Sequence, residues 1–442
     1  MSFYIVPKID INILKYLNSS DNITDYHKEH LCDNNFISKT LKNYLFSMKH
    51  QIDKYIDKWD LYKKYTNPYE YIHTNIPHAR QSICSYKPLS RSFFKMIEVI
   101  NIHDLLKNLT DINIKTYHLA EGPGGFIEAV AYLRKNKNDL YYGQTLIDNS
   151  DNNVPGWKKS NDFLKKNRNV KIITGNDNTG NLLCKENLKY CYDNFKNSID
   201  IITGDGGIDF SNDFNQQEKL AINLIFAQVC YAIIMQKQGG HFVIKIFDIF
   251  NKSTLEIIYL LASLYDRVYI TKPHSSRYAN SEKYIVCKGF RIKNSEEFYH
   301  KFYSLFENNI FDNFITNILT NDIPVYFVNK IEEINSIIGH YQIENINSTI
   351  NLIINNVSGD KLENIKNANI QKCLGWCNKH KLPVNSISDN KYITSVNANS
   401  SKTENSSKTE NSSKSENSSK SENSSKTENS SKTENSANHI IT

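Results

Sequence analysis

The chain has 442 residues, of which 39% are hydrophobic and 23% charged, and an excess of basic over acidic side chains gives a net charge of +6. This length predicts two or three domain-sized units. The 16 glycines and 9 prolines are too few for a collagen-like or linker-dominated chain. The small positive charge permits an anionic partner without requiring one.

We expect no secretory signal, because Lys8, Asp10 and Lys15 lie where the apolar part of a signal would be. The longest stretch without a charged residue, 220–236, is shorter than the ~20 residues that a membrane span needs. We therefore expect no membrane association. The eight cysteines form no CxxC pair, which favours a reducing compartment inside the cell over a disulfide framework.

Residues 1–84 are rich in Tyr, Asn, Lys and Ile, and their apolar spacing predicts helices over 11–17 and 37–61. Aromatic and basic residues interleave in Tyr62-Lys63-Lys64-Tyr65 and again over 69–80. Such a pattern occurs where rings stack on bases and lysines reach phosphates, and equally in an amphipathic helix with packed tyrosines. We interpret 1–84 as a helical extension that faces RNA, with ordinary helix packing as the alternative.

Between residues 85 and 293, short apolar runs alternate with helical patterns, the clearest of which are 125–134 and 215–236. Bare apolar runs are typical of strands that are covered on both faces. The alternation predicts an α/β fold with a doubly wound sheet. The predicted strands are 115–120, 141–147, 170–174, 199–203, 241–246, 267–271 and 283–290.

The remaining chain divides into a helical region, 294–388, and a polar tail, 389–442. The helical region includes 370–380, where Cys373 and Cys377 lie four residues apart without further ligands nearby, so we expect packing and no metal site. In the tail the unit Asn-Ser-Ser-Lys-(Ser/Thr)-Glu repeats six times over 399–434. This neutral repeat has no large apolar residue to offset the entropy of ordering, which predicts disorder.

A glycine-rich motif, Leu119-Ala120-Glu121-Gly122-Pro123-Gly124-Gly125-Phe126, lies between a predicted strand and a predicted helix. Glycines allow a ligand to approach the backbone closely, and a helix N-terminus offers free N–H groups. The motif is neither GxxxxGK(S/T) nor GxGxxG, which excludes a P-loop and disfavours a dinucleotide. It predicts a site for a nucleotide-like cofactor, with a tight turn as the alternative.

Three further motifs place a charged residue at the end of an apolar strand. They are Ile201-Ile202-Thr203-Gly204-Asp205-Gly206-Gly207, His241-Phe242-Val243-Ile244-Lys245-Ile246-Phe247-Asp248, and the segment 272–284 with Glu282. A charge in such a position is costly unless it has a partner or a function. Surface ion pairing and helix capping are the alternatives to a site at the edge of the sheet.

Together GPGGF, GDGG, FVIKIFD and KPHSSRYANSEKYIVCKGF resemble the FtsJ/RrmJ-type ribose 2′-O-methyltransferases. The resemblance is to the cap-specific branch and the related proteins of large DNA viruses, and it covers about residues 85–293. It implies a Rossmann-like class I methyltransferase sheet, S-adenosyl-L-methionine as cofactor, and RNA as substrate. It also implies a catalytic tetrad of Lys95, Asp205, Lys245 and Glu282.

The resemblance further implies a set of cofactor-binding residues: Gly122, Pro123, Gly124, Gly125, Phe126, Asp177, Asn181, Leu182 and Asp205. Two departures from the family pattern are visible. The glycine loop reads GPGGF where bacterial rRNA enzymes usually have APGGW, and Asn181 stands where an acid is often found, so Asp177 is the alternative contact to adenosine.

The chemistry of ribose methylation agrees with these roles. A 2′-hydroxyl must lose its proton as it attacks a methyl group, and a lysine accepts a proton only when neutral, although the reference pKa of lysine is ~10.4. The positive charges of Lys95 and of the cofactor sulfonium would favour the neutral form of Lys245. Asp205 would orient Lys245, and Glu282 would hold Lys95 or Lys245 in place.

We therefore predict an RNA ribose 2′-O-methyltransferase that acts on cap-proximal nucleotides of mRNA, with Lys245 as general base. The alternatives are an enzyme for rRNA or another internal site, and a catalytically silent RNA-binding subunit. Lys272, His274 and Arg277 are candidate phosphate contacts. We expect the protein inside the cell and off the membrane, in the host cytoplasm or virion if the source is viral.

Overall fold

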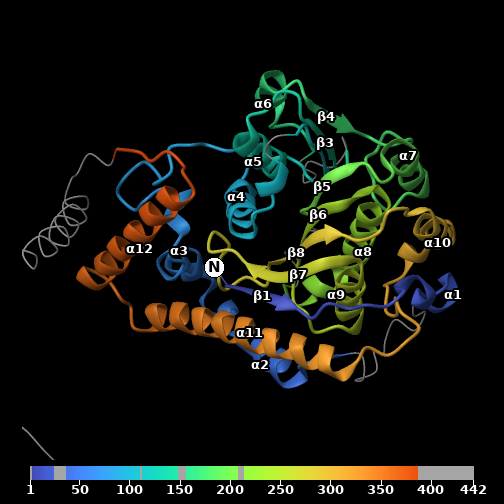
Figure 1. The fold of residues 1–442 in the computed structure, drawn as a ribbon. Coiled ribbons are helices and arrows are strands. Elements are labelled where there is room, and N and C mark those ends of the chain that lie inside the picture. The colour runs from blue at the N-terminus through green and yellow to red at the C-terminus, as the bar shows by residue number, and fades with distance from the viewer. Residues whose placement is uncertain (1, 24–35, 110–111, 148–155, 208–213, 387–442) are drawn as a thin grey trace, which may run out of the picture. The chain divides into compact units, whose positions relative to one another are not determined.

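The computed structural model describes residues 2–23, 36–109, 112–147, 156–207 and 214–386 (Figure 1). The chain up to Ile387 forms one compact unit. The predicted disordered tail over 389–442 lies outside the described residues.

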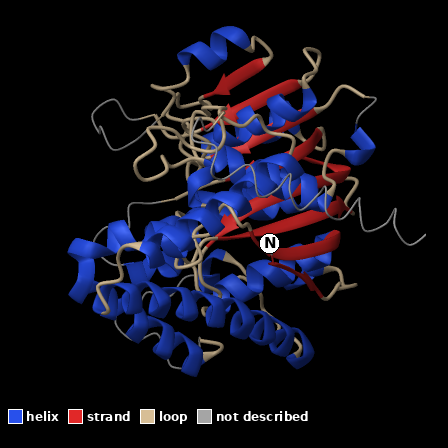
Figure 2. Cartoon of the chain, turned by 90° about the vertical axis from the view of Figure 1, so that its left-hand side faces the viewer, coloured by secondary structure: helices blue, strands red, loops and turns tan. Residues whose placement is uncertain are grey.

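One sheet of eight strands runs through the unit, in the order β1-β7-β8-β6-β5-β2-β3-β4. Figure 2 shows these strands in red, stacked side by side with helices packed along them. Strands β4, β3, β2, β5 and β6 are parallel, whereas β8, β7 and β1 continue the sheet antiparallel. The strands are β1 (Ser2–Val6), β2 (Lys115–Leu119), β3 (Leu140–Gln144), β4 (Val170–Ile173), β5 (Ile199–Gly204), β6 (Gln236–Ile246), β7 (Tyr265–Lys272) and β8 (Lys283–Phe290).

Helices cover both faces of the sheet. On one face α4 (Ser92–His103) and α5 (Gly125–Arg134) share a core with β3, β6 and β8. On the other face α7 (Lys185–Phe195), α8 (Gln217–Met235) and α9 (Lys252–Leu264) pack against β2, β5 and β6 (Figure 1). Because both faces are covered, all six residues of β5 are buried. This arrangement confirms the predicted doubly wound α/β fold.

The N- and C-terminal additions pack on each other. Leu45 of α2 (Lys39–His50) and Trp59 of α3 (Ile56–Thr66) share an apolar cluster with Ile346 and Ile350 of α11 (Val325–Ile354). Figure 1 shows α11 running along α2. The other helices are α1 (Ser20–Ile23), α6 (Asn161–Lys166), α10 (Glu296–Glu307) and α12 (Asp360–Lys379), with 3-10 turns η1 (Ile13–Tyr16), η3 (Gln51–Tyr55), η4 (Glu70–Ile72), η5 (Lys107–Leu109), η6 (Phe214–Gln216) and η7 (Ile310–Asp312).

The first strand was not anticipated by the sequence pattern. Strand β1 pairs antiparallel with β7 at the edge of the sheet, and its Phe3 and Ile5 side chains are about half exposed. A five-residue apolar run without turn signals gives no local clue to such a distant pairing. The helix predicted over 37–61 is divided by η3 into α2 and α3, and that predicted over 370–380 is the end of the longer α12. The boundaries proposed at 84 and 293 stay predictions.

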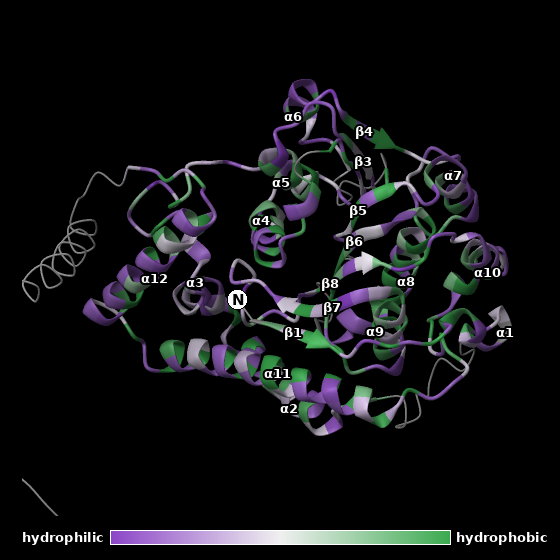
Figure 3. Cartoon of the chain, viewed as in Figure 1, coloured by the Kyte–Doolittle hydropathy of each residue, from purple (hydrophilic) through white to green (hydrophobic). Residues whose placement is uncertain are grey.

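Helix α8 is the one described helix that is long and apolar enough to span a membrane. Its apolar window is 78% buried inside the protein. Apolar residues are frequent in α8 and α9, next to the sheet, whereas α12 is largely hydrophilic (Figure 3). Helix α8 packs against the sheet, α7 and α9 in one core, and this burial explains why most of its residues are apolar.

Candidate active site

Four charged side chains meet where strands β5, β6 and β8 lie side by side. Asp205 directly follows β5, Lys245 is the penultimate residue of β6, and Glu282 directly precedes β8. Parallel strands end at the same edge of a sheet. Strand β8 is antiparallel to β6, with Lys245 opposite Tyr284, so it begins at that same edge. These three residues therefore lie together, and Lys95 of α4 is the fourth member of the group.

The two-residue period of the strands directs these side chains to one face. Val243 belongs to the core beneath α4 and α5, whereas Phe242 and Ile244 belong to the opposite core, so Lys245 shares the face of Val243. Tyr284 likewise lies beneath α4 and α5. Lys95 reaches the same place from α4, which covers that face.

The tetrad forms two ion pairs. Lys95 Nζ lies 2.5 Å from Glu282 Oε1, and Lys245 Nζ lies 3.1 Å from Asp205 Oδ1. Lys245 also donates a hydrogen bond of 2.8 Å to the main-chain oxygen of Asp205. The Tyr284 hydroxyl donates a second hydrogen bond of 2.5 Å to Glu282 Oε1. All four side chains keep between 10% and 19% of their surface exposed, so a substrate group can reach them.

The electrostatics of the tetrad keep Glu282 ionised. Burial by itself raises the pKa of Glu282, but the charges of Lys95 and Lys245 and the hydrogen bonds from Lys95 and Tyr284 bring it far below the usual range. Both lysines thus act on one carboxylate. The four groups form a single electrostatic unit in which two ammonium groups alternate with two carboxylates.

The glycine loop lies at the end of β2, next to β5 in the sheet. Ala120 and Gly124 both have positive φ, of 51° and 113°, which turns the chain sharply. The buried Glu121 carboxylate accepts hydrogen bonds from the N–H groups of Phe126 and Ile127, at 2.7 and 3.0 Å. These first N–H groups of α5 are therefore occupied by protein, whereas the motif had suggested free donors. The sequence motif did not indicate this capping role of Glu121.

The other residues of the glycine loop fit tightly against their neighbours. Gly122 and Pro123 are joined by a cis peptide bond. A Cβ atom on Gly125 would lie 2.1 Å from Ser92 Oγ, so only glycine permits this approach of α5 to α4. The Phe126 side chain is buried in the core beneath α4. Only the backbone of Phe126 can therefore face a cofactor.

The second predicted cofactor loop follows β4. The exposed Asp177 carboxylate accepts the N–H of Thr179 at 2.9 Å and the amide of Asn187 at 2.8 Å. Asn181 caps the next turn by accepting the N–H of Leu183 at 2.9 Å. The Leu182 side chain is buried in the core, so it does not present an apolar surface to a ligand.

The residues proposed as phosphate contacts are engaged by protein. Arg277 forms a bidentate pair with Glu70, with nitrogen–oxygen distances of 2.6 and 3.0 Å. The His274 ring is hydrogen-bonded to the Tyr278 hydroxyl at 2.6 Å. Lys272 donates to two main-chain oxygens, described below. Arg277, His274 and Lys272 are thus engaged in contacts within the protein.

Arg91 is a candidate that the sequence analysis did not select. It precedes α4, four residues before Lys95, a spacing that places two side chains on one face of a helix. Its Nε is buried without a hydrogen-bond partner among the described residues. Burial and the charge of Arg277 lower the pKa of Arg91, against the opposing effect of Glu70 and Glu282. Arg91 could have been found in the sequence from its position four residues before Lys95.

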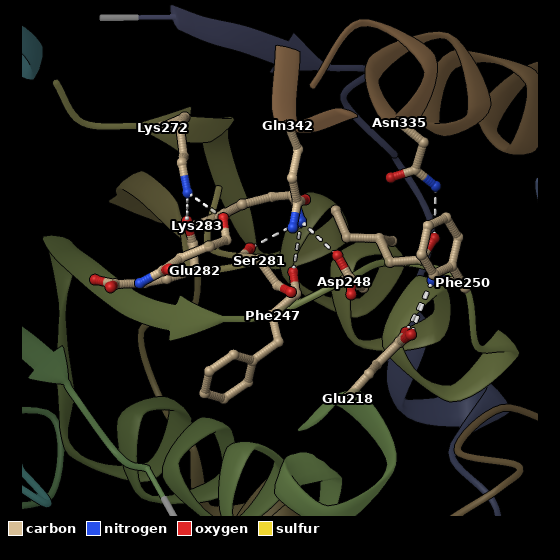
Figure 4. Close-up of polar contacts among 12 residues, drawn as sticks. Glu218, Phe247, Asp248, Phe250, Lys272, Ser281, Glu282, Lys283, Asn335 and Gln342 are labelled. Atoms are coloured by element: carbon tan, nitrogen blue, oxygen red, sulfur yellow. Dashed lines mark hydrogen bonds and ion pairs between the residues drawn. The ribbon is translucent and has the colours of Figure 1, made fainter. Parts of the chain in front are cut away.

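Two buried lysines hold the segment that carries Glu282. Lys272 Nζ donates to the main-chain oxygens of Asn280 and Glu282 at 2.5 and 2.7 Å. Lys283 Nζ donates to the main-chain oxygens of Ser281 and Phe247 at 3.0 and 2.8 Å. Figure 4 shows both ammonium groups directed at this segment. The main chain on either side of Glu282 is therefore fixed by hydrogen bonds from two buried lysines.

Asp248 balances this buried positive charge. Its carboxylate lies 3.4 Å from Lys283 Nζ and 3.0 Å from Nζ of Lys49, which comes from α2. Lys49 also donates to Ser281 Oγ at 3.1 Å. Burial raises the pKa of Asp248, but the two lysines lower it to about 2. Asp248 is thus a buried carboxylate that needs both lysines.

Helix α11 reaches the same region from outside the sheet. Gln342 Nε2 donates to the main-chain oxygen of Ala279 at 2.9 Å, and Asn335 Nδ2 donates to that of Ile249 at 2.5 Å. On the other side of the β6–α9 connection, Glu218 accepts the N–H of Phe250 at 2.9 Å (Figure 4). The C-terminal addition is therefore attached to the chain segments that follow Lys245 and precede Glu282.

Comparison with known proteins agrees with this geometry. Residues 88–290 match the family model described as FtsJ-like methyltransferase. Cap-specific mRNA (nucleoside-2′-O-)-methyltransferase 2 of Danio rerio is 30% identical over 265 residues, which cover 58% of this chain and 35% of that protein. Cap-specific mRNA (nucleoside-2′-O-)-methyltransferase 1 of Dictyostelium discoideum is 29% identical over 369 residues, which cover 76% of this chain and 45% of that protein.

Among solved structures, a putative ribosomal RNA methyltransferase from Plasmodium falciparum is 22% identical, with a TM-score of 0.32, and the match covers 46% of this chain and 97% of that one. This chain spans less than half the length of the two curated relatives. The likeness to proteins of large DNA viruses stays a prediction, because both relatives come from cellular organisms. Residues 88–290 of this chain form a domain of the FtsJ-like methyltransferase family, with a Rossmann-like sheet.

Proposed function

We propose that the protein is an S-adenosyl-L-methionine-dependent RNA ribose 2′-O-methyltransferase that modifies cap-proximal nucleotides of mRNA. The observation that carries this proposal is the meeting of Lys95, Asp205, Lys245 and Glu282 as two linked ion pairs beside the glycine loop. Alternating ammonium and carboxylate groups suit a proton transfer from a hydroxyl group far better than they suit packing, because buried charges are costly.

The residues at the ends of β2 and β4 fit the cofactor. The main chain bends at Ala120 and Gly124 after the end of β2, and Gly122 and Pro123 between them stay partly exposed. Asp177 is exposed at the end of β4, which is where sugar hydroxyls of the cofactor would reach its carboxylate. Asp205 adds a negative charge that suits a sulfonium. S-adenosyl-L-methionine, when bound, supplies an activated methyl group.

The tetrad then handles the proton of the ribose hydroxyl. Neutral Lys245 would accept this proton at Nζ, so that the ribose oxygen could take the methyl group that bound S-adenosyl-L-methionine would supply on cleavage of its methyl–sulfur bond. Asp205 holds Lys245 by the 3.1 Å contact and stabilises the ammonium that forms. Glu282, kept ionised, fixes Lys95 at 2.5 Å and so holds it beside Lys245.

The choice of capped mRNA as substrate is supported by the curated relatives, both of which are cap-specific mRNA methyltransferases by name. Arg91, which is half-buried and has an Nε without a partner among the described residues, is our candidate to meet a phosphate of such a substrate. A capped transcript as substrate also implies action inside the cell.

The test uses full-length protein, S-adenosyl-L-methionine with a labelled methyl group, and one short RNA sequence prepared with and without a cap. We expect label on a cap-proximal 2′-oxygen of the capped RNA and at least tenfold less on the uncapped RNA. Equal labelling of both would assign an internal site instead. RNA binding without any labelling would assign a catalytically silent subunit.

A further inference from the structure

A cavity of about 510 Å³ lies beside the tetrad but contains none of its members. Its walls come from the end of α3, from the β7–β8 connection, from α11 and from α12. All of these walls except the β7–β8 connection lie outside residues 88–290, the part that matches the family model. Its volume is within the range of small-ligand sites, roughly 300–1,000 Å³. The cavity is therefore an addition to the methyltransferase core.

Three tyrosines line the cavity: Tyr65 from α3, Tyr278 from the β7–β8 connection and Tyr341 from α11. The Tyr341 side chain is 51% exposed, so its ring is available to a ligand. Aromatic rings at a nucleic-acid site bind unstacked bases by their faces. The aromatic content of the walls thus favours a planar ligand.

The charges in the cavity disfavour a phosphate. Its one lining cation, Lys272, is buried, and its Nζ already donates to the main-chain oxygens of Asn280 and Glu282. Burial lowers the pKa of Lys272 to about 7, which weakens its positive charge further. The lining carboxylate, Glu344, is exposed and has no ion pair or hydrogen bond within the described part of the chain. The cavity therefore offers acceptor oxygens and aromatic faces.

A guanine base matches this combination. Its N1–H and N2–H groups lie side by side on one edge and both donate, and a carboxylate accepts two such bonds at once. Cytosine and uracil stack less and lack this pair of donors, and adenine has one donor group on the corresponding edge. Among the four RNA bases, guanine alone can stack on the tyrosines and also give Glu344 two hydrogen bonds from one edge.

The cavity is also close enough to the tetrad to hold a base of the same RNA. Lys272 lines the cavity and is hydrogen-bonded to the main chain of Glu282 at 2.7 Å, so one side chain separates the two sites. Gln342, between Tyr341 and Glu344 on α11, is bound to Ala279, three residues before Glu282. The same helix thus lines the cavity and holds the catalytic segment.

We propose that this cavity, lined by Tyr65, Tyr278, Tyr341 and Glu344, binds a guanine base of the RNA whose ribose is at the tetrad. This inference rests on the proposed function for the identity of the RNA, but its binding chemistry does not. A guanine of the transcript and the guanine of a cap share the donor edge that Glu344 would recognise.

The test measures binding of GMP, AMP, CMP and UMP to the full-length protein by calorimetry, with S-adenosylhomocysteine present to occupy the cofactor loop. We expect GMP to bind about tenfold more tightly than CMP and UMP. Tyr341→Ala should weaken GMP and AMP alike by about tenfold through lost stacking. Glu344→Gln should weaken GMP by about tenfold and leave AMP unchanged, because only guanine presents two donors.

Matched controls come from the same helix. Tyr326→Ala and Glu333→Gln change an exposed tyrosine and an exposed glutamate of α11 that do not line the cavity, and we expect wild-type binding from both. Thermal melting verifies that each variant is folded. Equal binding of all four nucleotides by the wild type, or wild-type GMP binding by both cavity variants, would overturn the inference.

Methyl transfer separates this inference from the proposed function. If Glu344→Gln loses its GMP preference while the wild type methylates no RNA, the cavity assignment stands and the proposed function falls. If the wild type methylates RNA and both cavity variants keep the wild-type KM and GMP affinity, the proposed function stands and the cavity assignment falls. A higher KM for capped RNA only assigns the cap guanine to the cavity, and a higher KM for capped and uncapped RNA assigns a guanine of the transcript.

Discussion

The proposed role of Lys245 depends on the two-residue period of β6, because this period determines which side chains lie next to Lys245. The alternation along β6 places it on the face covered by α4, where Lys95 and the Glu282 carboxylate lie. Asp205 meets it from the adjacent strand at 3.1 Å. A lysine one residue earlier or later in β6 would enter the opposite core, beneath α8 and α9.

Replacement of Lys245 tests its role as the base. We expect Lys245→Ala to lower methyl transfer by at least about 10²-fold, since a positioned general base contributes roughly 10²–10⁴-fold. Binding of S-adenosyl-L-methionine, measured by calorimetry, should change little, because Lys245 lies outside the glycine loop. Lys237→Ala, at the exposed start of the same strand, is the control. Substantial transfer by Lys245→Ala would mean that another group takes the proton.

Glu218 makes stability depend on pH in a direction that can be measured. Burial raises its pKa from 4.5 to about 7. Between pH 4.5 and 7 the unfolded chain therefore releases a proton that the folded protein keeps, so the free energy of unfolding decreases as pH rises through this window. The shift corresponds to at most about 3 kcal/mol.

Glu218→Gln keeps an acceptor oxygen for the Phe250 N–H but does not titrate. We expect its melting temperature to fall less than that of the wild type between pH 5 and pH 8. Glu256, whose pKa burial also raises to about 7, contributes to the slope that remains. A variant with the full wild-type slope would show that Glu218 is ionised in the folded protein.

At the scale of elements, the connection between β7 and β8 is the best-anchored segment of the site. It receives side chains from β7, β8, α2 and α11, through Lys272, Lys283, Lys49 and Gln342. Such anchoring gives Glu282 a fixed direction, which a catalytic group on a loop otherwise lacks. The site therefore depends on both terminal additions as well as on the sheet.

Removal of the carboxylate of Asp248 tests this anchoring. Asp248→Asn leaves the ammonium groups of Lys49 and Lys283 buried without their counter-charge, and breaking such a buried pair costs about 3–5 kcal/mol. We expect a loss of that size in urea unfolding. Asp193→Asn, which breaks an exposed pair with Lys189 on α7, should cost far less, because solvent screens this pair. Similar losses in the two variants would contradict a structural role for the buried cluster.

At the scale of the whole molecule, the additions before and after the methyltransferase domain form one helical cluster instead of two. Leu45 and Trp59 from the N-terminal part contact the core of α11, which lies more than 250 residues later in the chain. The same cluster forms most of the cavity that we assign to a base. The cavity that we propose for a base and the attachment of the additions thus depend on the same helices.

The repeat over 399–434 is expected to contribute nothing to this assembly. Each unit carries one Lys and one Glu, so its removal leaves the net charge near +6, and it has no apolar side chain to bury. We expect a chain ending at residue 398 to keep the melting temperature and the methyl-transfer rate of the full chain. A large drop in either quantity would show that the repeat binds the folded part or the RNA.

The sequence by itself was sufficient for the sheet core and the tetrad. Strands β2 to β8 begin and end within about five residues of the predicted runs, because a strand buried on both faces is a bare apolar run bounded by polar residues. Asp205, Lys245 and Glu282 were found because each stands next to the end of a strand in a motif of the family, whereas Lys95 was found only through the family resemblance. These signals are local and survive without knowledge of the partners.

Only the tertiary structure decided the rest. The edge strand β1, the Lys49–Asp248–Lys283 cluster, the occupied N–H groups of α5 and the cavity beside α11 all depend on residues that are far apart in the chain. The sequence around a lysine does not show whether its side chain will bind a phosphate or a buried main-chain oxygen. Lys272 was a predicted phosphate contact but donates to two main-chain oxygens. Its surroundings determine its charge, its partners and its use, and the folded chain alone brings those surroundings together.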